Sequence, residues 1–139
     1  MQDKIIKTKQ FSYPITEVWK AITVAEKISA WFILADFKAE VGYRYTFTHE
    51  QTKITGEVLK ANPVHELVYT WMVGGTDTIT TVSWWLEEKE SGTLLTLEHS
   101  GISNYPEATA VFMFENFQGG WIACLKNLES YLNSPVKEN

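Results

Sequence analysis

Apolar and polar residues alternate with a period of two through the middle of the chain, from about Phe37 to Gly101. Residues that favour turns interrupt this alternation at intervals, namely Gly42, Asn62-Pro63, Gly74-Gly75 and Ser91-Gly92. Alternating runs bounded by such residues are typical of antiparallel strands joined by hairpins. The pattern therefore predicts a curved antiparallel meander with strands at residues 36–40, 43–49, 53–61, 65–73, 78–89 and 93–100.

Further elements are expected on either side of this meander. Residues 3–12 alternate loosely and are rich in Ile, Thr and Phe, which predicts a first strand. Pro14 can open a helix in its first turn, where the missing N–H costs nothing, and Thr23 can cap a second short helix. After Pro106 a long helix is expected to run to about Leu132, because apolar residues recur at helical spacing. This apolar stripe consists of Phe114, Phe117, Trp121, Leu125, Leu128 and Leu132.

The chain of 139 residues is long enough for one domain, which we expect at residues 1–134, followed by a frayed tail at 135–139. A domain of this length buries roughly two-thirds of the surface of its unfolded chain, so it needs neither disulfides nor a structural metal. Aromatic residues make up 14% of the chain, which is more than so small a domain requires. They are therefore expected either to fill the core or to line a pocket.

The charge pattern excludes some classes of partner. The net charge is −5 and the basic residues do not cluster, so binding to the phosphate backbone of a nucleic acid is not expected. The segment Leu67–Leu86 has a single charged residue, Asp77, and is long enough to suggest a membrane span. Gly and Thr residues interrupt this segment, however, and the composition favours two strands and their connection instead.

The sequence also bears on the compartment. The N-terminus lacks the apolar segment of a signal peptide. The single cysteine, Cys124, lies in an apolar stretch, which favours a buried, inert thiol over a reactive one. We therefore expect the protein to be cytoplasmic.

Short stretches of sequence occur along nearly the whole chain in an order that is typical of one protein family. They are Phe11-Ser-Tyr-Pro-Ile-Thr-Glu-Val-Trp19, Ala21-Ile-Thr23, Trp31-Phe32, Gly56-Glu-Val58, Pro63 to Trp71, Gly92-Thr-Leu-Leu-Thr-Leu-Glu-His-Ser-Gly101, and Gly120-Trp121 followed by Leu125, Leu128 and Tyr131-Leu132. The chain thus resembles the activator of Hsp90 ATPase homologue 1-like family, within the START/Bet v 1-like superfamily. This resemblance implies an α+β helix-grip fold, in which a curved antiparallel sheet wraps around a long C-terminal helix and two short helices follow the first strand.

The chain departs from the family pattern at two places. Where the family often has an Arg, one residue and a Gly pair, this chain has Glu40-Val-Gly-Tyr43, so a ligand contact through that Arg is in doubt. Where the next-to-last strand usually carries a Thr, this chain has Trp85. If Trp85 faces outward, it leaves an apolar patch of the kind that marks interfaces, and a homodimer is then expected.

The resemblance further implies a cavity for an apolar molecule between the sheet and the long helix. The side chains expected to line it come from the inner face of the sheet, from the second helix and from the helical stripe. They are Trp31, Phe32, Tyr45, Phe47, Tyr69, Trp71, Trp84, His99, Phe114, Phe117 and Trp121. The alternative is that these side chains contact one another and fill the space as an ordinary core.

No catalytic residue, metal site or cofactor is predicted. The three histidines are far apart in sequence and none has the spacing of a metal ligand. His99 shares a strand face with Leu95 and Leu97 and so points inward, where it is interpreted as a wall residue rather than a general acid or base. Neither Cys124 nor Ser100 has an evident base beside it, and the Gly-x-Ser-x-Gly motif of hydrolases is absent.

These observations leave three functions open. The first is a module that binds a hydrophobic or aromatic small molecule, lipid-like or a metabolite, in the cavity. The second, implied by the family name, is a partner of an Hsp90-type chaperone. The third is an enzyme of the cyclase, hydratase or isomerase type, since relatives with this fold use pocket side chains for proton transfer.

Overall fold

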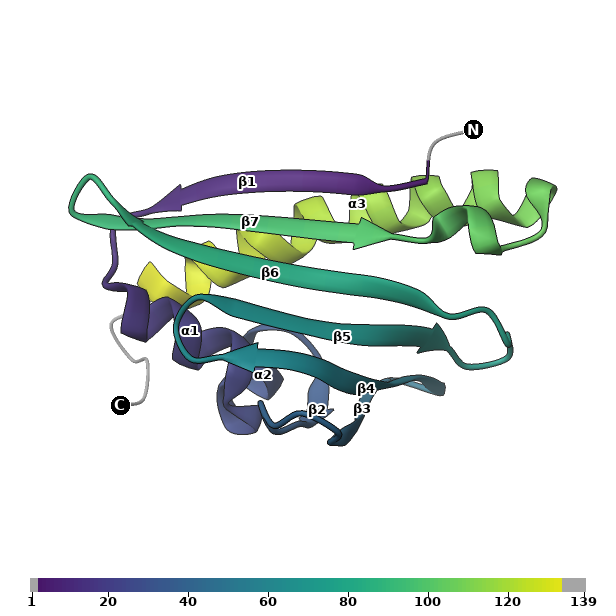
Figure 1. Ribbon diagram of the computed structural model, residues 1–139, viewed down its shortest axis with the longest axis horizontal. Helices are drawn as coiled ribbons and strands as arrows, with labels where there is room; N and C mark the ends of the chain where they lie inside the picture. The colour runs from purple at the N-terminus through teal and green to yellow at the C-terminus, as the bar shows by residue number, and fades with distance from the viewer. Residues whose placement is uncertain (1–2, 134–139) are drawn as a thin grey trace.

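A computed structural model describes residues 3–133 of the chain, and the predicted frayed tail lies outside them. A first strand and two short helices precede a run of strands and a long helix (Figure 1). The elements are β1 (Ile5–Phe11), α1 (Ile15–Thr23), α2 (Ala25–Trp31), β2 (Leu34–Asp36), β3 (Arg44–His49), β4 (Thr52–Asn62), β5 (Glu66–Val73), β6 (Thr80–Lys89), β7 (Gly92–Ser100), the short 3-10 helix η1 (Ile102–Asn104) and α3 (Glu107–Asn133).

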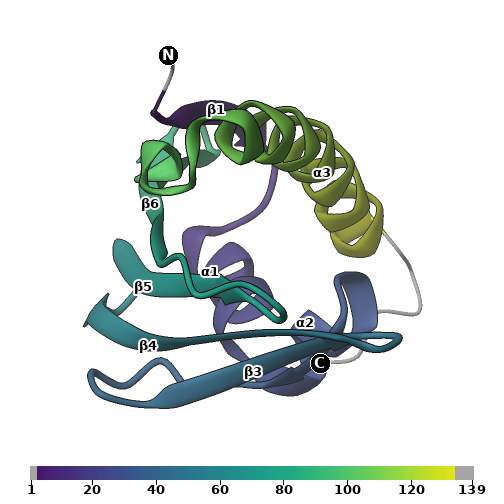
Figure 2. The same cartoon turned by 90° about the vertical axis from the view of Figure 1, so that its right-hand side faces the viewer.

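The strands form one antiparallel sheet in the order β1-β7-β6-β5-β4-β3-β2. Strands that follow one another in sequence are neighbours from β2 to β7, and β1 closes the far edge by pairing with β7. Figure 2 shows that the sheet curves from β1 through β6 to β3, while α3 and α2 lie on its open side. The predicted α+β helix-grip fold is thus confirmed.

The alternation along the strands places one row of side chains inside the curve. Leu67, Tyr69 and Trp71 on β5 are buried, and so are Val82, Trp84 and Leu86 on β6. Successive side chains of a strand point to opposite faces, so the residues between them form the outer face. On α3 the last four residues of the predicted stripe are buried, whereas the first two, Phe114 and Phe117, are half-buried. The long helix therefore packs most tightly through its C-terminal half.

The first strand of the meander differs from the prediction of residues 36–40. β2 covers only Leu34–Asp36, and the chain leaves the sheet at Phe37. The ring of Phe37 is buried against Tyr45, Phe47 and Tyr69, so it is held by the core rather than by strand pairing. Gly42 then takes a positive φ of 91°, a conformation that glycine adopts at no steric cost.

The predicted cap of the second helix is wrong. Val24 is the N-cap residue of α2, and it makes no side-chain hydrogen bond there. The hydroxyl of Thr23 instead donates to the backbone oxygen of Trp19, at 2.7 Å. Thr23 is the last residue of α1, and a threonine within a helix can donate its hydroxyl to the carbonyl four residues earlier.

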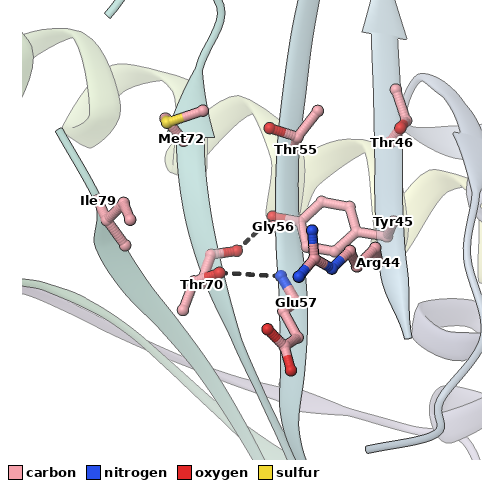
Figure 3. Close-up of a pocket in the computed structure, with 9 residues that line it drawn as sticks. All are labelled: Arg44, Tyr45, Thr46, Thr55, Gly56, Glu57, Thr70, Met72 and Ile79. Carbon is pink, nitrogen blue, oxygen red and sulfur yellow. Dashed lines mark hydrogen bonds between the residues drawn. The ribbon is translucent and has the colours of Figure 1, made fainter. Parts of the chain in front are cut away.

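The ladder between β4 and β5 opens at Gly56 and Glu57 (Figure 3). The backbone N–H of Glu57 donates to the side-chain oxygen of Thr70, at 2.9 Å, and the hydroxyl of Tyr45 donates to the backbone oxygen of Thr70, at 2.5 Å. Gly56 makes this possible, because a Cβ at this position would lie 2.0 Å from the Thr70 oxygen and 2.7 Å from the Tyr45 ring. A side chain of β3 is thereby fixed to β5 across β4.

Trp85 lies on the outer face of β6, opposite in direction to the buried Trp84. It is half-buried, and its indole N–H donates to the Glu66 carboxylate at 3.1 Å. This bond is the main reason that the pKa of Glu66 is lowered. The homodimer expected through Trp85 stays a prediction.

Candidate ligand-binding groove

A hollow of about 390 Å³ lies where α3 faces the strands β3 to β5. We call it the groove. The α2–β2 connection, the β3–β4 hairpin, β5 and α3 each contribute to its walls. It is lined by Phe32, Ile33, His49, Thr52, Ile54, Trp71, Val73, Met113, Asn116, Phe117, Gly120 and Trp121. None of these residues is Asp, Glu, Lys or Arg, so the groove is essentially apolar.

Local sequence periodicity explains how these side chains come together. Trp71 and Val73 are two positions apart on β5 and therefore share its inner face. On α3, Met113, Asn116, Phe117 and Gly120 follow the i, i+3, i+4, i+7 spacing of one helix face. Met113, Asn116 and Gly120 were not among the predicted site residues. The same spacing, counted from Met113, links them to Phe117.

The groove brings together four of the residues that the sequence predicted to line a cavity: Phe32, Trp71, Phe117 and Trp121. Their rings contact one another. The centroids of Trp71 and Trp121 are 5.3 Å apart, those of Phe32 and Trp121 are 6.3 Å apart, and those of Trp71 and Phe117 are 6.4 Å apart. These contacts place the aromatic wall on three separate elements, with Trp121 at its centre.

The other predicted residues do not line the groove. A second group of aromatic side chains, which we call the packed cluster, consists of Phe37, Tyr45, Phe47, Tyr69 and Trp84. The ring centroids of Phe37, Tyr45, Phe47 and Tyr69 lie 4.7 to 6.3 Å apart. The indole of Trp84 joins it by donating to the Tyr69 hydroxyl at 2.9 Å.

Trp31 and Phe114 lie outside both regions. Trp31 is buried, and its indole N–H donates to the backbone oxygen of Ala21 at 2.7 Å. Phe114 is a half-buried residue of α3 that packs against the core.

Burial fixes the protonation of two tyrosines of the packed cluster and of the nearby Cys124. Burial is the main cause that raises the pKa of Tyr45 and of Tyr69. It also raises the pKa of Cys124, whose thiol lies near enough to Tyr69 to add to the shift of that phenol. All three groups are therefore neutral at neutral pH, and the predicted inert thiol agrees with this environment.

His99 is fully buried behind the groove, where its ring contacts those of Trp71 and Phe117 with centroids 5.6 and 4.4 Å away. The indole N–H of Trp121 donates to its Nδ1 at 2.9 Å, so Nδ1 carries no proton. Nε2 lies 2.7 Å from the Thr80 hydroxyl, and that hydroxyl donates to the backbone oxygen of Trp71 at 3.2 Å. The Nε2–H of His99 therefore donates to the hydroxyl oxygen of Thr80, whose own proton is held by the Trp71 carbonyl.

This arrangement keeps His99 neutral. Burial lowers its pKa to about 3, because a charged imidazole would lose its hydration and gain no counter-ion. A neutral histidine with both nitrogens engaged has no proton to exchange with a bound molecule. His99 was predicted to line the cavity, but it lies behind the groove and is not among the lining residues.

The indole N–H of Trp71 has no hydrogen-bond partner, although Trp71 is only 4% exposed and lines the groove. Buried donors are rarely left unpaired in folded proteins. Within residues 3–133, no group of three or more His, Cys, Asp or Glu side chains could hold a metal ion. None of the helices described there is long and apolar enough to cross a membrane.

Two other hollows are more polar than the groove. One, of about 410 Å³, lies on the outer face of the sheet over the opening between β4 and β5, and threonines, Arg44 and Glu57 line it (Figure 3). The other, of about 670 Å³, lies between the start of α2 and residues 35–43 and has Glu26, Asp36, Lys38 and Glu40 in its walls. We take the groove as the candidate site because buried aromatic side chains line it.

Solved structures with the same fold cover nearly all of the chain. Protein MLL2253 from Mesorhizobium loti is 27% identical with a TM-score of 0.85, over 94% of this chain and 96% of that one. PFC0360w, an HSP90 activator from Plasmodium falciparum, is 22% identical with a TM-score of 0.82, over 96% and 99% of the two chains.

A third structure is DynU16, which is encoded in the dynemicin biosynthetic locus. It is 21% identical with a TM-score of 0.85, and the match covers 96% of this chain but 48% of that chain, so the present chain spans about half of DynU16. A search of curated proteins found no match.

A family model shows the relationship more directly than any single structure. The model of the activator of Hsp90 ATPase homolog 1-like protein matches residues 12–133. This match begins just after β1 and includes both short helices, the meander and the whole of α3. The chain therefore belongs to the activator of Hsp90 ATPase homolog 1-like family.

Proposed function

We propose that this protein binds a hydrophobic or aromatic small molecule in the groove between α3 and the sheet. The observation that supports the proposal is the lining: Phe32, Trp71, Phe117 and Trp121 present aromatic surface from a loop, a strand and a helix to one hollow. Its volume of about 390 Å³ falls in the range of roughly 300–1,000 Å³ that is common for small-molecule sites.

Binding without turnover fits the groove better than catalysis. His99 is neutral and hydrogen-bonded at both nitrogens, and His49 at the rim has a side chain that is 66% exposed. A general acid or base needs a proton that it can exchange within hydrogen-bond reach of the substrate. The lining side chains provide apolar contact and few polar groups, which suits recognition.

Two neighbouring glycines allow a matched test. Gly120 lines the groove and Gly119 does not, and a Cβ at either position would meet nothing within 4 Å. The variant Gly120→Leu should fill the groove, whereas Gly119→Leu should leave it open. Both replace an interior helical glycine by a good helix former, so neither is expected to destabilise α3.

The experiment measures thermal shifts with a panel of lipids, sterols and aromatic metabolites, together with native mass spectrometry of freshly purified protein. A ligand at one hundred times its dissociation constant should stabilise the folded state by about 2.7 kcal/mol. We expect this shift in the wild type and in Gly119→Leu, and its loss in Gly120→Leu. If no compound shifts the wild type and no ligand is retained, the proposal fails. Equal shifts in both variants would place binding elsewhere.

The family name favours a second candidate, association with an Hsp90-type chaperone. One of the structural relatives is described as an HSP90 activator, and the N-terminal half of α3 exposes Val111 by 54% and Phe112 by 65%. Stimulation of the ATPase of a purified chaperone tests this candidate, with Phe112→Ser as the variant expected to weaken it. Unchanged ATPase activity at saturating protein would exclude it.

A further inference from the structure

The unpaired indole of Trp71 indicates what kind of molecule the groove accepts. We propose that the ligand is uncharged and flat and carries a hydrogen-bond acceptor oxygen, such as a ketone, and that Trp71 Nε1–H donates to this oxygen. The inference rests on the proposed function, because it names the chemical class that the groove would bind. It adds one polar contact to a site whose other contacts are apolar.

The first argument is the contrast between Trp71 and four other indoles. Trp31, Trp84, Trp85 and Trp121 each donate to an oxygen or nitrogen of the protein, at 2.7 to 3.1 Å. Trp71 is as buried as Trp31, Trp84 and Trp121, but its N–H donates to no protein atom. Trp71 and Trp121 both line the groove, and only the N–H of Trp71 is unpaired there. An acceptor on a bound molecule would satisfy it, since buried donors are normally paired.

The second argument concerns charge. The lining has no Lys, Arg, Asp or Glu, and its one histidine, His49, has a side chain that is largely exposed at the rim. Behind the lining, His99 accepts the Trp121 N–H at Nδ1 and is buried in its neutral form. An ionised ligand entering the groove would lose its hydration without gaining a counter-ion, which is unfavourable. The acceptor is therefore expected on a neutral group.

The third argument concerns shape. The ring of Trp71 is perpendicular to that of Phe117, with an interplanar angle of 89°, while Phe32 and Trp121 stack at 24°. A wall made of ring faces and ring edges favours flat aromatic molecules, because aromatic groups pair in stacked and edge-to-face arrangements. An aliphatic ligand of the same surface area would gain the free energy of apolar burial but not the additional stacking and edge-to-face interactions.

An internal explanation for Trp71 competes with this proposal. Its N–H could instead point at the face of a neighbouring ring, since Phe117 and Phe47 both lie edge-to-face with Trp71 at centroid distances of 6.4 and 6.2 Å. Such a contact is weaker than a hydrogen bond to oxygen. A satisfied Trp71 would give no preference for ligands that carry an acceptor, so the two explanations predict different affinities.

The test uses pairs of compounds that differ only at the acceptor: indane with 1-indanone, fluorene with fluorenone, and xanthene with xanthone. Fluorene-9-carboxylate serves as the charged analogue. Dissociation constants are measured for the wild type, for Trp71→Phe, and for Trp84→Phe, whose indole already donates to Tyr69. Indole ¹⁵N–H spectra of the wild type, with Trp71 assigned from its variant, report the same contact without relying on the stability of a mutant.

We expect at least one ketone to bind the wild type about 2- to 12-fold more tightly than its hydrocarbon, the range of one net hydrogen bond. The carboxylate should bind more weakly than both members of the fluorene pair. The preference should persist in Trp84→Phe and disappear in Trp71→Phe, and the Trp71 indole resonance should shift with the ketone and not with the hydrocarbon.

Four results would overturn the inference. If hydrocarbon and ketone bind the wild type equally, or if the ketone preference survives in Trp71→Phe, the groove binds ligands without this hydrogen bond and the proposed function stands alone. Tighter binding of the carboxylate would contradict the uncharged class. If no member of any pair binds the wild type, the inference fails, and the panel with the Gly120→Leu variant then decides separately whether the proposed function fails too.

Discussion

The packed cluster and the groove lie side by side inside the same curved sheet, but they differ in how their polar atoms are used. In the packed cluster the hydroxyl of Tyr45 donates to Thr70 and the indole of Trp84 donates to Tyr69. In the groove the indole of Trp71 has no partner. Aromatic residues build both regions, so composition does not distinguish them.

The difference shows how one aromatic interior can serve two purposes. Where Phe37 fills the space beside Tyr45 and Tyr69, the rings contact one another and form ordinary core. Where α3 is less deeply buried, at Phe117 and Gly120, the rings border an open hollow. The packed cluster pairs the polar atoms of Tyr45, Tyr69 and Trp84, since an unpaired buried group destabilises a fold, whereas a binding site can leave one for its ligand.

The largest effect that we expect separates a glycine that contacts the packed cluster at Tyr45 from a glycine of the groove. Gly56→Ala should destabilise the protein by about 4 kcal/mol, because its Cβ would collide with the backbone oxygen of Thr70. Gly120→Ala should stabilise it by up to about 1 kcal/mol through helix propensity. Urea unfolding of both variants measures this. A cost below about 1 kcal/mol for Gly56→Ala would show that the opening between β4 and β5 is not fixed.

The next effect comes from His99, which lies behind the groove against Trp71, Phe117 and Trp121. Its pKa of about 3 in the folded state lies below the ordinary value of about 6.5, so between these values the unfolded state binds a proton that the folded state does not. The stabilising contribution is complete above pH 6.5 and is lost as the pH falls toward 3. From pH 6.5 to 4.5 we expect a loss of about 2 kcal/mol, because the unfolded histidine is half protonated at pH 6.5 and the slope approaches about 1.4 kcal/mol per pH unit only below that.

A variant that does not titrate provides the control for this prediction. His99→Gln keeps a donor and an acceptor, so its stability should change much less over the same interval. Below about pH 4.5 the carboxylates of Asp3 and Glu66 also contribute, since hydrogen bonds lower the pKa of each. Equal pH dependence of the wild type and His99→Gln above that value would contradict the assignment of His99 as a buried neutral group.

The smallest effect compares two tryptophans directly. Trp84→Phe removes a hydrogen bond to Tyr69 and leaves a gap inside the packed cluster, which should cost about 2 kcal/mol. Trp71→Phe removes an unpaired N–H beside the groove, so it should lower the free energy of unfolding by about 1 kcal/mol less than Trp84→Phe does. Chemical unfolding of the two variants gives the difference. If Trp71→Phe were the more destabilising of the two, its indole would have to be satisfied within the fold.

Much of the fold could be predicted from local sequence patterns. The period-two alternation indicated the strands of the meander, and the helical spacing of Trp121, Leu125, Leu128 and Leu132 indicated the buried face of α3. The prediction failed where a tertiary contact overrides the local signal. Phe37 leaves the sheet to enter the core, and Thr23 bonds back to Trp19 instead of capping α2.

The candidate site was predicted only in part, for a physical reason. The alternation of side chains along a strand shows that Tyr45 and Trp71 both point inward. It does not show which of the two contacts another ring and which borders the hollow. That depends on Phe37, on the depth of α3 and on the gap that Gly56 permits. Likewise, the proton on His99 is set by Thr80 and Trp121, which reach it from another strand and from the long helix.

The sequence by itself therefore determined the order of the elements, the inward face of each strand and the family, because these follow from short-range periodicity and local motifs. Only the tertiary structure decided which aromatic residues form core and which line the groove, and which buried N–H stays unpaired. Those properties depend on the distances between side chains that are far apart in the chain, and periodicity within one element does not contain them.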